Sequence, residues 1–238
     1  MSAISQTRTA AGALGKGFAA LGNPSVLWVI FVSLVLTLLG LVGLWKLMDW
    51  LLTGYSFFTW GWANWLLDNF TGIVLFFVVL LMFPAVLLIV TSMFLVYVVK
   101  AVEKQHYPHL PPPRDVPISE DLVYILKFTG LIIAVNLLVL PLYLLLPGIN
   151  FLISWTINGY ITGREYYDIV AMRRMGDRDR QAVRKRNGGK IFSAGFVMAI
   201  LMTVPFLNLL MPVVSAAYMT HVFHALWKPE DTPEGAAR

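Results

Sequence analysis

The sequence contains no cysteine and few charged residues. The absence of cysteine excludes disulfides, thiolate zinc sites and thiol catalysis. Charged residues make up 13% of the chain, against roughly 25% in a soluble domain, whereas hydrophobic residues make up 58%. The apolar runs do not alternate with polar residues, which excludes the strands of a membrane barrel. We therefore predict an all-α integral membrane protein, with a single domain over residues 1–228 and a disordered tail over 229–238.

Motifs of common enzyme classes are also missing. The chain has no G-x-S-x-G, no H-E-x-x-H and neither of the glycine-rich loops that bind nucleotides. His221 and His224 share a helix face but have no acidic or thiol partner nearby in the sequence, so no metal site is predicted. We expect neither catalysis nor a cofactor. We also expect no cleavable signal peptide, because the first apolar run is a full span long.

Two segments predict long transmembrane helices. Residues 26–45 are uncharged over about one bilayer thickness. Residues 69–99 contain a second span that carries Pro84, which a membrane helix tolerates. The aromatic segment between them, 50–67, is typical of a membrane interface. Before them, apolar residues recur at three- and four-residue steps over 3–22, which predicts an amphipathic helix on the membrane surface.

Two later stretches have an unusual length for membrane segments. Residues 128–163 and 191–227 contain no Asp, Glu, Lys or Arg over 36 and 37 residues, whereas one crossing needs about 20. A prolyl break lies near the middle of each stretch, at 147–150 and 205–208. We expect two half-membrane helical hairpins that enter and leave on the same side. In the alternative, both halves of each hairpin cross the membrane completely. This alternative places the segments outside the hairpins on the same side of the membrane, so the distribution of charge cannot separate the two.

The basic residues predict the orientation of the chain. Of 18 Lys and Arg residues, only Lys46 lies outside segments 1–16, 100–127, 164–190 and 228–238. The hairpin arrangement places these four segments on one face, which the positive-inside rule makes cytoplasmic, together with both termini. The net charge of +5 is therefore explained by topology, and no nucleic-acid partner is expected.

The segment 164–174 mixes apolar and charged residues. Its tyrosines, Tyr166 and Tyr167, are expected to face lipid or protein. Attraction to anionic lipid explains a basic segment of this kind. The functional alternative is a positive electrostatic potential that concentrates anions at the mouth of a pore. The charged residues are expected to face water or to pair at i,i+4 steps; they are Arg164, Glu165, Asp168, Arg173 and Arg174.

The hairpin tips are candidate anion sites. A helix that begins inside the membrane leaves free N–H groups at its start, and these groups favour an anion together with the helix dipole. Asn150 and Asn208 lie in the first turn of each returning helix, where they cap the helix or present an amide to a ligand. Lipid cannot satisfy such groups, so each tip requires protein or water around it. Polar residues along the limbs, such as Asn158, bond helix to helix or line the same pathway.

The chain resembles the CysZ/etoposide-induced-protein family of helical membrane proteins over about residues 3–228. The resemblance implies a bacterial inner-membrane protein with two spanning helices and two half-membrane hairpins, assembled as a homo-oligomer. In the CysZ branch it implies passive sulfate uptake for cysteine synthesis, without ATP or a cofactor. The residues that carry the similarity are Gly17-Phe18, Asn23-Pro24, Ser119-Glu120-Asp121, Pro147-Gly148-Ile149-Asn150, Asn158-Gly159-Tyr160, Arg164-Glu165-Tyr166-Tyr167, Pro205-Phe206-Leu207-Asn208 and Pro212.

One departure from the family concerns sulfate. Members that bind sulfate resemble each other in a pair of arginines just after the first-helix proline. Here no basic residue follows Pro24 until Lys46, so a site at that position would rely on Ser25 and backbone N–H groups. The candidate substrate-binding residues are Asn150, Asn208, Ser25, Gly148, Asn158 and Arg164.

These observations predict a passive anion transporter, with sulfate as the leading cargo and with the lipid bilayer and a small inorganic anion as its partners. The alternative is a non-transporting membrane scaffold that binds lipid or protein partners. The scaffold predicts tips that pack dry, with every Asn amide satisfied within one protomer.

Overall fold

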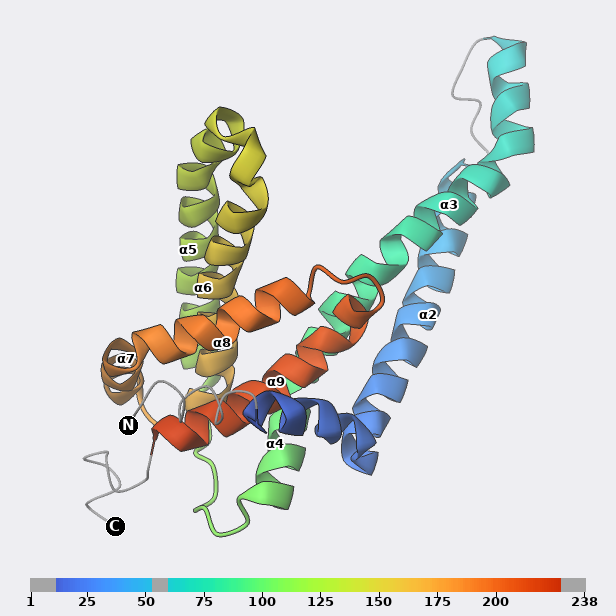
Figure 1. Ribbon diagram of the computed structural model, residues 1–238. Helices are drawn as coiled ribbons and strands as arrows, with labels where there is room; N and C mark the ends of the chain where they lie inside the picture. Colours follow the sequence, from blue (N-terminus) through green and yellow to red (C-terminus); the bar gives the residue numbers. More distant parts are fainter. Residues whose placement is uncertain (1–11, 53–59, 228–238) are drawn as a thin grey trace. The chain divides into compact units, whose positions relative to one another are not determined.

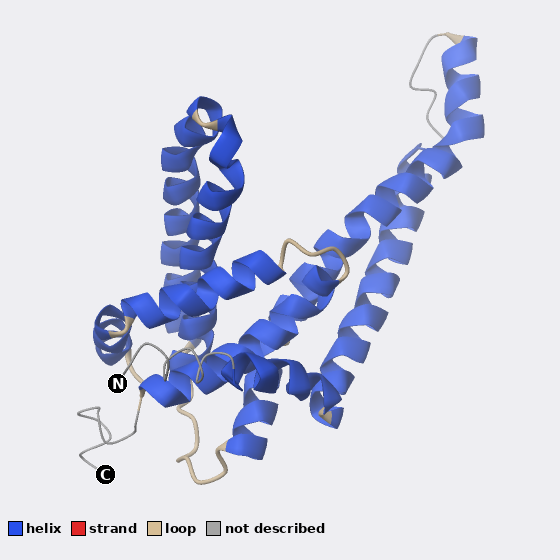
Figure 2. Cartoon of the chain, viewed as in Figure 1, coloured by secondary structure: helices blue, strands red, loops and turns tan. Residues whose placement is uncertain are grey.

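The computed structural model describes residues 12–52 and 60–227, which form helices and turns without a strand (Figure 2). The all-helical prediction is confirmed over these residues. Three predicted features lie outside them: the first part of the amphipathic helix at 3–11, the aromatic residues of 53–59 and the tail at 229–238.

The chain divides into two compact units, and each is described by itself. Residues 24–94 form one unit, and residues 1–23 with 95–238 form the other. The first unit is a pair of long helices that pack together, α2 (Pro24–Leu52) and α3 (Gly61–Met93) (Figure 1). Pro84 lies inside α3 without ending it, as membrane helices allow. The turn at Phe94 ends the helix earlier than the predicted range 69–99.

The second unit contains the two predicted hairpins. It begins with helical residues 12–19 and the 3₁₀ turn η1 (Ala20–Gly22). The remaining elements are α4 (Leu95–His106), α5 (Ile118–Leu145), η2 (Pro147–Ile149), α6 (Asn150–Ala171), α7 (Asp177–Arg186), α8 (Gly188–Leu201) and α9 (Leu207–Leu226).

The helices end and begin at the predicted breaks. The short turn η2 joins α5 to α6, and these two helices run side by side (Figure 1). A second turn over 202–206 joins α8 to α9. At 1.5 Å per residue, the 28 residues of α5 span about 42 Å, whereas the 14 residues of α8 span about 21 Å. Among the four hairpin helices, α5, α6, α8 and α9, only α8 is clearly shorter than the roughly 30 Å of a bilayer core.

One predicted limb is longer than expected. Counted from Pro212, the last uncharged run up to residue 227 has fewer than 20 residues. In the structure α9 begins at Leu207 and continues through Pro212 for 20 residues, because a proline in a membrane helix does not have to end it. Among the described residues, four segments are long and apolar enough to cross a membrane: Pro24–Trp50, Leu75–Met93, Ile118–Tyr143 and Leu207–Leu226.

Helix α9 is the core of the second unit. Residues 211–221 are all buried, since α4, α6, α8 and η1 pack around this helix. Helix α5 has the opposite character: Leu137 and Leu138 are exposed, as are most of its apolar residues. A helix that is apolar on its outer face suits contact with lipid.

The tightest helix contact is the crossing of α6 with α8. Gly159 and Gly163 on α6 face Gly195 on α8, and a Cβ atom on Gly195 would lie 2.0 Å from the carbonyl oxygen of Gly159. Small residues spaced four apart allow two helix backbones to approach this closely. The crossing holds the end of α6 that carries Arg164 and Asp168.

Candidate functional site

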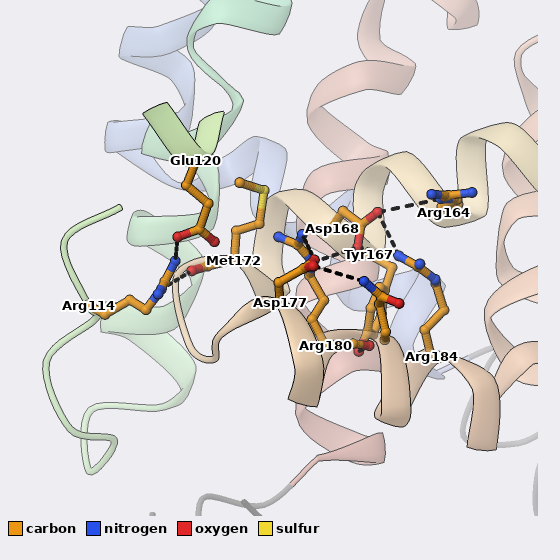
Figure 3. A network of polar contacts seen from close by, with 10 residues as sticks. Arg114, Glu120, Arg164, Tyr167, Asp168, Met172, Asp177, Arg180 and Arg184 are labelled. Atoms are coloured by element: carbon orange, nitrogen blue, oxygen red, sulfur yellow. Dashed lines mark hydrogen bonds and ion pairs between the residues drawn. The ribbon is translucent and has the colours of Figure 1, made fainter. Parts of the chain in front are cut away.

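A buried carboxylate at the end of α6 gathers three arginines. Asp168 is fully buried, and Arg184 Nη1 donates to its Oδ1 and Oδ2 at 2.8 and 2.9 Å. Arg180 Nε lies 3.4 Å from Oδ1, and Arg164 Nε lies 3.8 Å from Oδ2 (Figure 3). Two of these arginines come from α7 and one from α6 itself. The cluster therefore carries more positive than negative charge.

Hydrogen bonds between α6 and α7 fix the positions of these arginines. The Tyr167 hydroxyl donates to the carbonyl oxygen of Arg180 at 3.1 Å. Asp177 in the first turn of α7 accepts from Arg180 Nη2 at 2.6 Å and from Gln181 at 2.9 Å. An acidic residue is favourable at a helix N-terminus because of the helix dipole. The same carboxylate thus stabilises α7 and holds Arg180 against α6.

Helix α5 supplies an aromatic support for two guanidinium groups. Tyr124 and Phe128 stack with ring centroids 5.5 Å apart. Arg180 lies over the Tyr124 ring at 5.4 Å, and Arg164 lies near the Phe128 ring at 5.9 Å. Arginine readily stacks on aromatic faces. A stacked guanidinium keeps its N–H groups at the edge of the plane, where they can reach another ligand.

These side chains line a cavity of about 140 Å³ between α5, α6 and α7. This volume is far larger than the roughly 10–15 Å³ that one water requires. Exposed residues at its rim open it to solvent, among them Lys127 and Gln181. The described lining residues are Glu120, Val123, Tyr124, Lys127, Phe128, Arg164, Asp168, Asp177, Arg180, Gln181 and Arg184.

Several buried polar atoms at this cavity lack a hydrogen-bond partner within the chain. The donors are Arg180 Nη1 and Nε, Arg164 Nε and the Tyr124 hydroxyl, and the acceptor is Glu120 Oε1. The other oxygen of Glu120 is held by Arg114 in a salt bridge. A buried donor without an acceptor costs about 1–3 kcal/mol. The cavity therefore requires water or a ligand rich in acceptors.

Burial and charge act in opposite directions on Asp168. Burial raises the pKa of this carboxyl group, while the positive charges of Arg184, Arg180 and Arg164 lower it. Burial also raises the pKa of the neighbouring Glu165. Burial outweighs the arginines, so the pKa of Asp168 stays above its usual value although each arginine favours the ionised form.

A second buried network joins α4 to the end of α6 and to α9. Glu103 on α4 pairs with Arg174 at 2.7 Å and with Arg173 at 3.5 Å, and His224 Nε2 lies 3.1 Å from Glu103 Oε1. Burial raises the pKa of Glu103, but its hydrogen bonds with His224 and Arg174 and the charges of both arginines outweigh burial and lower the pKa to about 2. These contacts anchor the turn between α6 and α7.

The comparisons with known proteins identify the family. Residues 13–212 of the chain match the family described as sulfate transporter CysZ/etoposide-induced protein 2.4. The chain belongs to this family. The match supports a membrane-transport role at the level of the family, which is not a family of enzymes. No curated protein and no solved structure matches the chain.

Of the residues predicted to bind substrate, the structure brings only Arg164 to the cavity. Gly148 lies in η2 at the tip of the first hairpin, and Asn150 begins α6 beside it. Asn158 lies further along α6, is exposed and donates to Ser154 Oγ at 3.0 Å. Asn208 lies in the first turn of α9. Ser25 belongs to the other unit, in the first turn of α2. The role of these residues as ligands stays a prediction.

The structure decides one alternative at the hairpin tips. Neither α6 nor α9 has a side-chain cap at its start, so Asn150 and Asn208 do not serve as caps. Asn150 Oδ1 is buried and has no hydrogen-bond partner in the chain. An amide oxygen of this kind requires a donor such as water.

The expectation that the charged residues of 164–174 face water or pair at i,i+4 steps is confirmed for Arg164 and Asp168, which form that pair. It is wrong for Arg173, which is buried and pairs with Glu103 on α4. Sequence patterns did not indicate that Glu103 and Asp168 would be buried, because each lies beside basic residues in a polar segment. The G-x-x-x-G spacing of Gly159 and Gly163 was a usable signal for the close crossing that positions the site.

Proposed function

We propose that this protein carries a small inorganic anion passively across a bacterial inner membrane, with sulfate as the leading cargo. The observation that carries the proposal is the group of buried arginines at the cavity between α5, α6 and α7, whose N–H groups are not all satisfied by hydrogen bonds within the chain. Such groups favour anions. The family match and the four helices long enough to span a membrane support transport as the context.

The proposal has a defined topology. Both termini and the basic segments lie on the cytoplasmic side, so the arginine cavity faces the cytoplasm, and the two hairpins reach into the membrane. We expect a homo-oligomer that needs no cofactor and performs no catalysis. Lipid surrounds the apolar outer faces of α2, α3 and α5.

A non-transporting scaffold is the competing function. It requires that every Asn amide be satisfied within the protomer. The unpartnered Oδ1 of Asn150 does not agree with that requirement, whereas it suits a tip that meets water. This observation favours transport over the scaffold.

The direct test is flux in proteoliposomes. Purified protein should carry labelled sulfate into vesicles faster than empty vesicles admit it. Asn150→Ala and Asn208→Ala should each lower the rate several-fold, because each removes an amide that a polar pathway uses. Asn136→Ala is the matched control, since Asn136 is exposed on α5 and donates to the carbonyl of Ile132 in its own helix. Absence of flux for sulfate and for several other anions would refute the proposal.

A further inference from the structure

The cavity between α5, α6 and α7 has more unpartnered donors than acceptors. Arg180 Nη1 and the Tyr124 hydroxyl are buried without a hydrogen-bond acceptor, and Glu120 Oε1 is the unpartnered acceptor among the described lining residues. Arg180 Nε and Arg164 Nε make no hydrogen bond either, although they pair with Asp168 at 3.4 and 3.8 Å. Arg180 is 5% exposed, so bulk water does not solvate its guanidinium group. A ligand with several acceptor oxygens would satisfy these donors together.

The carboxylates at the cavity are already engaged by the protein. Asp168 accepts two hydrogen bonds from Arg184. Asp177 accepts from Arg180 and Gln181, and Glu120 is bound by Arg114. The described lining contains four cationic and three acidic side chains. A net positive charge therefore remains for a ligand.

The geometry favours an oxyanion over a halide. The donors come from three side chains on three different helices, so they converge on the cavity from different directions. The aromatic rings of Tyr124 and Phe128 hold the planes of Arg180 and Arg164, which leaves the guanidinium edges to bind. An anion with several oxygens can accept from donors on different walls of the cavity at once, whereas a halide must lie within hydrogen-bond distance of all of them from a single atom. The volume of about 140 Å³ leaves room for a companion water at Glu120.

We propose that this cavity binds one tetrahedral oxyanion, as free sulfate or phosphate or as the phosphate of a lipid headgroup. Arg164, Arg180 and the Tyr124 hydroxyl are its ligands. Arg184 keeps Asp168 occupied so that this carboxylate does not repel the anion. The inference rests on the proposed function, because it gives the transported anion a binding site on the cytoplasmic side.

The first arm of the test measures binding without transport. Purified wild-type protein in an uncharged detergent is titrated with labelled sulfate and with labelled phosphate. Tyr124→Phe should weaken saturable binding about tenfold, as expected for the loss of one hydrogen bond to a charged ligand. The hydroxyl has no partner in the protein, so this variant should unfold no more easily than wild type. Arg164→Gln should weaken binding at least as much.

The matched control is Arg178→Gln. Arg178 lies on α7, is exposed and does not line the cavity, so this variant removes the same charge as Arg164→Gln without touching the site. Its affinity should stay within about twofold of wild type, since exposed charges contribute little. Equal losses in the two arginine variants, or unchanged affinity in Tyr124→Phe, would overturn the site. If Arg164→Gln does not fold, Tyr124→Phe alone decides.

The second arm distinguishes the two sources of the oxyanion. The same titration is run in nanodiscs of phosphatidylcholine alone and in nanodiscs that contain phosphatidylglycerol. If free sulfate is the natural ligand, its affinity should be the same in the two kinds of nanodisc. A fall in the apparent sulfate affinity that deepens as the phosphatidylglycerol content rises assigns the site to a lipid phosphate, because the two oxyanions then compete for it.

The outcomes also separate this site from the proposed function. If sulfate is transported but its binding does not depend on Tyr124, the proposed site is refuted and the proposed transport function is not. If binding depends on Tyr124 but no flux is observed, the proposed site is supported and the proposed transport function is refuted. No saturable binding of sulfate, phosphate or anionic lipid removes the site.

Discussion

Three glycines determine how closely α6 approaches α8. A Cβ atom on Gly163 would lie 2.6 Å from the carbonyl oxygen of Ile191, and one on Gly159 would lie 2.8 Å from the Cα of Phe196. All of these neighbours are backbone atoms, which cannot move aside as a flexible side chain can. The side chains of Arg164 and Asp168 follow directly on α6, so these glycines also position the arginine cavity.

Gly195→Ala should destabilise the second unit. The added methyl group would lie 2.0 Å from the carbonyl oxygen of Gly159, so the two helices must separate. We expect the free energy of unfolding to fall by about 3 kcal/mol, as for an overpacked core. Unfolding followed by tryptophan fluorescence in detergent measures this change.

Gly130→Ala is the control for that substitution. Gly130 lies inside α5, and a Cβ there meets nothing within 4 Å. Alanine favours a helix over glycine by up to about 1 kcal/mol, so this variant should be as stable as wild type or slightly more stable. Equal destabilisation by both substitutions would contradict the role of the close crossing.

At the scale of elements, the turn between α8 and α9 contains an unusual backbone conformation. Phe206 has φ 63° and ψ −44°, and among the described non-glycine residues it alone has a positive φ. The N–H of Leu207 donates to the carbonyl of Pro205 at 2.7 Å, which closes a γ-turn around Phe206. This form of the γ-turn is rare and strained for an L residue. The strain is located where the chain reverses direction.

Phe206→Gly should therefore stabilise the turn. Glycine adopts a positive φ without steric cost, and we expect a gain of about 1 kcal/mol in the free energy of unfolding. The Phe206 side chain is 86% exposed, so little packing within the chain is lost. Unfolding in detergent micelles measures the change.

Phe206→Ala separates the backbone from the side chain. It removes the ring but keeps a Cβ in the strained conformation, so it should be no more stable than wild type. A loss of stability in both variants would show that the exposed ring matters more than the strain, as an anchor in lipid would.

At the scale of the whole molecule, the absence of cysteine makes the topology testable. Single cysteines placed at Gly148 and Pro205 report on the two hairpin tips. An impermeant maleimide added to intact cells should label them far more slowly than a cysteine at Asp49, which we place in the periplasm between the two spans. The reason is that a tip inside the membrane meets the confined water of its own pathway and not the bulk water outside the cell.

A cysteine at Arg178 completes that experiment. It should react only after the cells are permeabilised, because the proposed topology places the basic segments in the cytoplasm. Labelling of both tips as fast as the Asp49 position would show that each hairpin crosses the membrane completely. The half-membrane arrangement would then be replaced by six full crossings.

The sequence by itself determined the class of the protein and the ends of its hairpin helices. The lengths of the uncharged runs and the positions of Pro147 and Pro205 can be read from the sequence. The bilayer favours uncharged helical segments of sufficient length, so these features determine where a helix can lie in lipid. The predicted break at 147–150 coincides with η2. The start of α9 at Leu207 falls within the predicted break at 205–208, and Pro212 lies inside that helix without ending it.

Only the tertiary structure decided which residues form the candidate site. The sequence predicts anion sites at the hairpin tips, because a helix is broken there. The arginine cavity is instead built from the other end of the first hairpin and from α7. Asp168 and Tyr124 are far apart in the chain, and nothing in their local pattern indicates that they meet. They meet because a glycine crossing holds α6 in place and because hydrogen bonds fold α7 back against it. Burial then leaves donors of ordinary basic residues without a hydrogen-bond partner, and this is the basis of the proposed anion site.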